Sequence, residues 1–170
     1  MIDGKTYKLQ NVEYFDAEEQ RIVHPRMVSP TGHVTKLAPD SNDLRGRFVP
    51  WPFPGKLIAA RGHAATSHHT WYYVLNGSGV HGPVAHLHSG LNGGPIFRDI
   101  NHDGRKEMVF DNYSYYLDQP KGRLPDKFLV YRIGADGLPR FWKSVPNAKH
   151  EQLKDTTGFD SMPRFLRPGS

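Results

Sequence analysis

The sequence predicts an all-β fold, or one nearly so, with antiparallel sheets in a propeller-blade-like or sandwich arrangement. Short runs of aromatic and β-branched residues recur along the chain, and Gly, Pro and Asn turn signals separate them at intervals of roughly ten residues. Helical periodicity is almost absent. The length of 170 residues suits one β-rich domain over residues 1–160, followed by a loose tail at 161–170.

The first third of the chain has the weakest strand signals. Runs at 6–9 and 21–23 read as short strands on either side of a polar turn at 16–20. Residues 26–56 are expected to be an irregular, Pro-rich segment in which Trp51 and Phe53 stand between prolines. This segment covers either its own sheet or that of a second copy, and the second alternative predicts a homo-oligomer.

The β signal becomes clear after Lys56. Asn76-Gly77 and the segment Gly134–Gly137 are typical of hairpin turns. Residues near 147–155 alone look briefly helical. The predicted strands cover residues 57–60, 70–75, 84–88, 96–98, 108–110, 128–133 and 138–142.

Composition excludes several classes of protein. Cysteine is absent, so disulfides and thiolate metal sites are excluded. The net charge of +5 comes from scattered basic residues, which argues against a nucleic-acid partner, and no apolar run reaches membrane-spanning length. Met1–Lys5 lacks the apolar core of a signal peptide, so the chain is either cytosolic or the mature form of an exported protein.

The sharpest motif is the acidic loop, Asp99–Glu107, which has the pattern Asp-x-Asn-x-Asp-Gly-x-x-Glu. Calcium prefers six to eight oxygen ligands, and alternate side chains converge on one point if Gly104 lets the chain curl. A helical EF-hand needs Glu as the twelfth residue, where this chain has Phe110. The predicted calcium ligands are the side chains of Asp99, Asn101, Asp103 and Glu107, with the backbone carbonyl of Arg105.

Apolar strand-like runs flank this loop, and the whole resembles the FG-GAP/VCBS-type calcium-binding repeat of β-propellers over residues 70–133. Asn101 and Glu107 replace Asp in the repeat pattern. Only one copy is visible, whereas a propeller needs at least four blades. The resemblance implies a non-catalytic calcium-binding structural or interaction module of a periplasmic or extracellular protein, with a protein or glycan as partner.

Histidines form the second cluster, with seven of the ten between residues 63 and 102. His86 and His88 alternate along one strand and therefore share a face, where a zinc, copper or iron ion is one interpretation. Hydrogen-bonded or solvent-facing histidines are the other. The first interpretation makes the protein a metalloenzyme, although no HExxH motif accompanies the pair.

Two further patterns carry less weight. The glycines of residues 77–82 match GxGxxG, but no helix follows to hold a dinucleotide, and a glycine hairpin is preferred. Six aromatic residues suggest a sugar-stacking platform and hence a carbohydrate-binding module, although core packing is the preferred interpretation. They are Trp71, Tyr72, Tyr73, Tyr113, Tyr115 and Tyr116.

Overall fold

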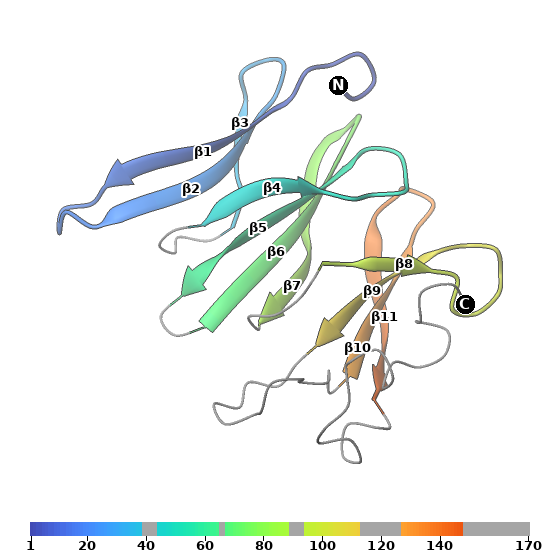
Figure 1. The fold of residues 1–170 in the computed structure, drawn as a ribbon. Coiled ribbons are helices and arrows are strands. Elements are labelled where there is room, and N and C mark those ends of the chain that lie inside the picture. The colour runs from blue at the N-terminus through green and yellow to red at the C-terminus, as the bar shows by residue number, and fades with distance from the viewer. Residues whose placement is uncertain (39–43, 65–66, 89–93, 113–126, 148–170) are drawn as a thin grey trace. The chain divides into compact units, whose positions relative to one another are not determined.

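The computed structural model describes residues 1–38, 44–64, 67–88, 94–112 and 127–147. These ranges hold eleven strands and no helix, and every strand pairing is antiparallel (Figure 1). The all-β prediction is therefore confirmed. The chain divides into two units, Met1–Gly90 and Leu91–Ser170, and each is described by itself.

The first unit contains two sheets. The three-stranded sheet has the order β1-β2-β3 and the four-stranded sheet the order β4-β5-β6-β7, so each strand lies beside its neighbour in sequence. The strands of the first sheet are β1 (Lys8–Phe15), β2 (Arg21–Val28) and β3 (Val34–Lys36). Those of the second are β4 (Arg45–Val49), β5 (Lys56–Ala64), β6 (Ser67–Asn76) and β7 (Gly79–His88).

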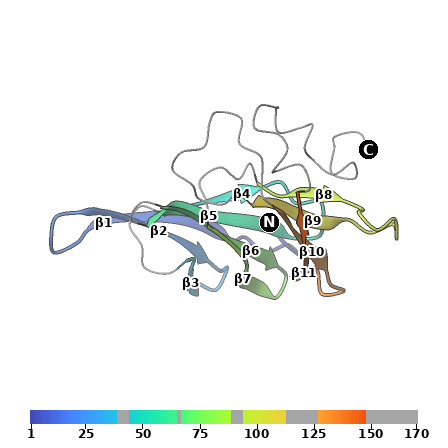
Figure 2. The same cartoon turned by 90° about the horizontal axis from the view of Figure 1, so that it is seen from below.

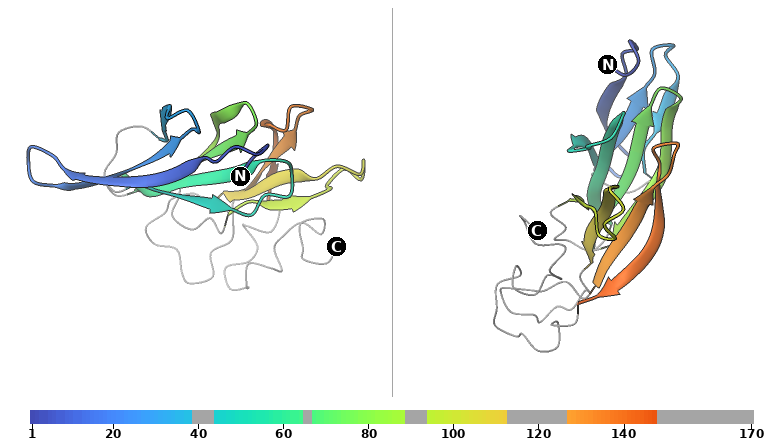
Figure 3. Two further views of the ribbon diagram at one scale, coloured as in Figure 1. Left: turned by 90° about the horizontal axis from the view of Figure 1, so that it is seen from above. Right: turned by 90° about the vertical axis from the view of Figure 1, so that its right-hand side faces the viewer.

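The β1–β2 hairpin is longer than the sequence predicts, because pairing runs unbroken from Lys8 to the turn. In that turn, Asp16 accepts the backbone N–H of Gln20 at 2.9 Å, which confirms the predicted turn at 16–20. Arg21 donates to Glu13 across the hairpin at 2.8 Å. Figures 2 and 3 show this turn projecting beyond the other strands of its unit.

Residues 26–56 were expected to be irregular, and that expectation is wrong, since the segment includes β3 and β4. Contacts distant in sequence hold β4 in place. Asn11 donates to the carbonyl of Gly46 at 3.2 Å and accepts its N–H at 2.7 Å. A Cβ on residue 46 would lie 2.8 Å from Cβ of Pro25, so glycine allows the close approach. Farther along, the rings of Trp51 and Phe53 pack edge to face at 4.9 Å.

The two sheets of the first unit share one apolar core. Its buried residues come from β2, from the segment after β3 and from both central strands of the larger sheet: Met27, Leu37, Leu44, Ile58, Ala60, Trp71, Tyr73 and Leu75. Backbone bonds tie the connecting segment to this core. Leu44 donates its N–H to Val23 at 2.9 Å, and Ala38 donates to the Tyr73 hydroxyl at 2.6 Å.

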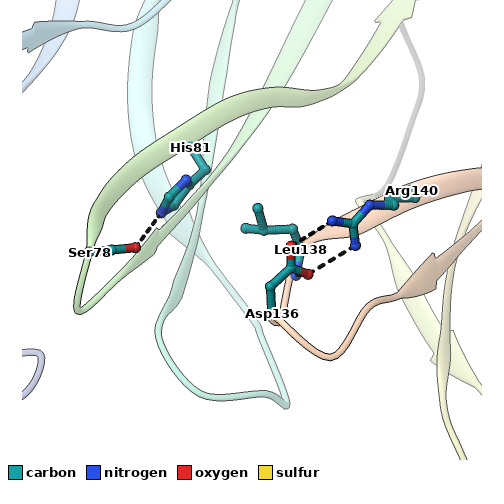
Figure 4. Close-up of polar contacts among 5 residues, drawn as sticks. All are labelled: Ser78, His81, Asp136, Leu138 and Arg140. Carbon is teal, nitrogen blue, oxygen red and sulfur yellow. Dashed lines mark hydrogen bonds and ion pairs between the residues drawn. The ribbon is translucent and has the colours of Figure 1, made fainter.

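The second unit contains a single sheet with the order β11-β10-β9-β8. Its strands are β8 (Ile96–Arg98), β9 (Glu107–Asn112), β10 (Lys127–Ile133) and β11 (Pro139–Pro146). Val109, Phe128 and Val130 form a buried cluster on it. The predicted hairpin at 134–137 is confirmed, and there Arg140 donates to Asp136 at 2.9 Å (Figure 4).

Several expectations concern residues outside the described ranges. They are the brief helix near 147–155, apart from Asn147 itself, the loose tail at 161–170, and Tyr113, Tyr115 and Tyr116. Among the described residues, none belongs to a helix with the length and apolar character that membrane crossing requires.

Candidate functional site

Two antiparallel strands frame the acidic loop. Strand β8 ends at Arg98 and β9 begins at Glu107, and these two residues face each other in the ladder. Residues 99–106 therefore form the whole connection, and Figure 1 shows it projecting from the end of the sheet. The β-loop-β setting expected from the sequence is present.

Asp99 holds the loop in a curl. One of its carboxylate oxygens accepts the N–H of Asp103 at 3.1 Å, and the other accepts the N–H of Gly104 at 2.8 Å. Gly104 has a φ of +84°, a conformation that glycine adopts without the steric cost of a Cβ. His102 also has a positive φ, of +60°. The sharp turn predicted at Gly104 is therefore observed.

Asp103 is bonded on both carboxylate oxygens. It accepts the Asn101 side-chain N–H and the Arg105 backbone N–H, each at 2.9 Å. These bonds, with a smaller contribution from the Arg105 and Arg132 charges, hold the pKa of Asp103 below its usual value. The carboxylate is therefore ionised at neutral pH, and the residue is exposed.

Glu107 is buried, with only 2% of its surface exposed. One carboxylate oxygen accepts the N–H of Ile100 at 3.0 Å, across the base of the loop. Ile100 in turn packs against the buried cluster of its sheet. Glu107 thus anchors the loop to the sheet, which the ligand pattern alone does not reveal.

The loop's donor set matches calcium in kind, since three carboxylates and one amide supply hard oxygen ligands. The carboxylate oxygens that bond to loop N–H groups each retain a second lone pair for a cation. The described residues nevertheless contain no group of three or more His, Asp or Glu side chains gathered closely enough to hold a metal ion. The assignment of calcium to this loop therefore stays a prediction. The curl of the loop and its negative charge are the features that favour it.

The structure adds a third histidine to the pair named from the sequence. His86 and His88 both lie on β7, and the backbone of His88 pairs with that of His69 on β6. The imidazole of His69 contacts that of His86, and its Nδ1 lies 3.0 Å from Nε2 of His86. Both rings lie nearly parallel to the indole of Trp71, with centroids 5.3 and 4.7 Å away.

Sequence reasoning missed His69, although a signal for it exists. Counting back from the Gly77-Ser78 turn places residue 69 opposite residue 86, on the same face of the hairpin. The observed ladder shifts by two residues near Tyr72, so that Trp71 is directly opposite His86. A shift of two residues keeps the faces in phase.

The structure also bears on the aromatic residues and on the GxGxxG segment. Trp71, Tyr72 and Tyr73 are buried, which agrees with core packing and leaves no exposed platform on these three rings. The GxGxxG segment lies in the β6–β7 hairpin, as preferred from the sequence. In it, the Asn76 side chain accepts the N–H of Ser78 at 3.0 Å, and Ser78 contacts His81 at 2.9 Å (Figure 4).

Comparison with known proteins supplies no relative from which a family can be assigned: no protein-family model, curated protein or solved structure matches this chain.

Proposed function

We propose that the acidic loop binds calcium, and that the chain is a non-catalytic, calcium-stabilised structural or interaction module of an exported protein. The observation that carries the proposal is the curled loop itself, in which Asp99 bonds the N–H groups of Asp103 and Gly104. A curl of this kind brings alternate side chains toward a common centre, as a calcium loop requires.

Charge supports the same proposal. Asp99 and Asp103 lie in the connection and Glu107 is the first residue of β9. In the part of the chain that the structure describes, no Lys or Arg forms an ion pair with these three carboxylates. Carboxylates within so short a segment repel one another, and a divalent cation relieves that repulsion. Location outside the cytosol fits a site of this kind, because calcium is plentiful there.

The proposal is tested by thermal unfolding with and without calcium, on protein carrying no histidine tag. Calcium at about 100 times its Kd stabilises a folded state by roughly 2.7 kcal/mol, which corresponds to a rise in Tm of roughly 5–10 °C. Asp103→Ala should abolish this rise, because it removes a carboxylate from the middle of the curl. Calorimetric titration should show one calcium per chain.

Asp136→Ala is the matched control. Asp136 occupies another Asp-Gly turn of the same sheet and bonds Arg140 rather than loop N–H groups alone. This variant should keep the full calcium response. The proposal fails if millimolar calcium leaves the Tm of the parent protein unchanged, or if Asp103→Ala responds as the parent does.

A further inference from the structure

A pair of imidazoles lies over a single indole on the β6–β7 hairpin. The centroids of His69 and His86 are 5.2 Å apart with 17° between the ring planes, and their nearest nitrogens are 3.0 Å apart. With nearest nitrogens that close and centroids this far apart, the rings meet edge to edge. Both planes lie within 14° of the Trp71 ring plane, so the indole supports the pair from one side.

The protonation state of the pair follows from its hydrogen bond. Of the two nitrogens in contact, one carries the proton and the other offers a lone pair, so two neutral imidazoles satisfy the bond. Neutral imidazole is the form that binds transition metals. His86 is exposed and His69 is half-buried, so a metal ion can approach from solvent.

From this geometry we infer that His69 and His86 form a binding site for a divalent transition metal, with Cu²⁺ bound most tightly. If each nitrogen binds a metal at about 2.0–2.1 Å, a nitrogen separation of 3.0 Å gives a ligand–metal–ligand angle of roughly 95°. That angle is close to the right angle of tetragonal Cu²⁺ and smaller than the tetrahedral angle that Zn²⁺ favours. The general affinity order of divalent metals also places Cu²⁺ above Zn²⁺.

Binding requires two internal rearrangements. Both rings turn in their planes, because the facing nitrogens point at each other along their hydrogen bond and must instead point at the ion. The imidazole that donates in the pair moves its proton to its other ring nitrogen through solvent, so that both facing nitrogens present lone pairs to the ion. Each ring remains neutral, and no net proton is released. Water completes the coordination, because the two imidazoles supply only two ligands.

This site is independent of the calcium proposal. It lies in the first unit, on β6 and β7, whereas the acidic loop lies in the second unit between β8 and β9. The ligand chemistry also differs, since imidazole nitrogen suits copper and zinc while carboxylate oxygen suits calcium. Loss of either site should leave the other metal response unchanged.

The test is a titration of tag-free protein with Cu²⁺, followed by tryptophan fluorescence and by metal analysis after dialysis. We expect one Cu²⁺ per chain and tighter binding than Zn²⁺. Changing a group that only orients a ligand typically costs 10–100-fold in affinity, so losing a ligand in His69→Ala or His86→Ala should cost roughly 100-fold or more. His81→Ala, on the same strand β7 but bonded to Ser78 and Asn76, is the matched control and should bind as the parent does.

Trp71 gives a second readout that does not need the histidine variants to fold. Trp71 is one of three tryptophans and its indole contacts both imidazoles, so Cu²⁺ should quench its emission. Trp71→Phe should remove most of the quenching while retaining stoichiometric Cu²⁺. The inference is overturned if the parent binds no stoichiometric Cu²⁺, if folded His69→Ala and His86→Ala variants bind it unchanged, or if quenching persists in full in Trp71→Phe.

Discussion

Two loops of the second unit join neighbouring antiparallel strands, and both contain Asp followed by Gly, yet they treat their carboxylates in opposite ways. In the hairpin at 134–137, Asp136 accepts two N–H groups of Arg140 and the backbone N–H of Leu138. In the acidic loop, Asp99 and Asp103 accept bonds only from the loop's own N–H groups.

The difference lies in the partner of the carboxylate rather than in the Asp-Gly pair. Arg140 is four residues from Asp136 and neutralises it directly. The acidic loop concentrates three carboxylates without an equivalent ion pair among the described residues. The Asp136 carboxylate is neutralised within its own turn, whereas the charge of the acidic loop is what the proposed calcium ion would neutralise.

The largest effect in this comparison is expected from Glu107→Ala. Removing this buried carboxylate leaves the Ile100 N–H without its acceptor, which should lower the free energy of unfolding by about 1–3 kcal/mol even without calcium. Urea denaturation in the presence of a chelator measures the loss.

Glu107→Gln serves as its control, because the amide oxygen can still accept the Ile100 N–H while the charge is gone. It should retain most of the stability and lose calcium affinity. Equal destabilisation by both changes would show that Glu107 acts through its charge rather than through this bond.

A smaller and matched pair of effects is expected at the two turn glycines. Gly104 and Gly137 have φ values of +84° and +75°, and a Cβ at either position would meet nothing within 4 Å. Alanine at each should therefore cost about 1–2 kcal/mol through backbone conformation alone. Only Gly104→Ala should also weaken the calcium response, as calorimetric titration would reveal; a weakened response in Gly137→Ala would contradict the assignment of calcium to the acidic loop.

The smallest effect is expected from Arg140→Gln, and it depends on pH. Hydrogen bonds from Arg140 lower the pKa of Asp136 from 3.8 to about 2, so the folded state favours the ionised carboxylate. Because the folded-state pKa is depressed, this stabilisation is complete above about pH 4 and is lost as pH falls toward about 2.

Arg140→Gln should therefore lower Tm modestly at neutral pH and have no effect near pH 2. NMR titration should show the pKa of Asp136 rising toward its usual value in the variant. A Tm difference that persists unchanged at the acid end would mean that Arg140 stabilises the hairpin by packing rather than by charge.

Much of the second unit was predictable because its signals are local. The hairpin at 134–137 and the acidic loop are each made by residues that are close together in sequence. Turn chemistry identifies the first and ligand spacing the second. The burial of Glu107 was not predictable from spacing. It depends on how Ile100 packs against a cluster of β9 and β10 residues.

The first unit was predicted less well, because some of its contacts join segments that are distant in sequence. Residues 45–47 are part of β4, which pairs with β5, and Asn11 on β1 bonds both backbone groups of Gly46. Partners about 35 residues apart in sequence leave no periodic trace in either segment. Strands β3 and β4 also pair with their sequence neighbours β2 and β5, and the sequence interpretation missed both strands.

The sequence by itself determined the all-β class, the positions of the hairpin turns and the acidic motif, because alternation and turn residues act over a few positions. Only the tertiary structure decided which strands are neighbours and which side chains meet. A two-residue shift in the β6–β7 ladder places Trp71, rather than His69, directly opposite His86. That shift arises where the strands pack, and packing is a property of the assembled sheet rather than of either strand alone.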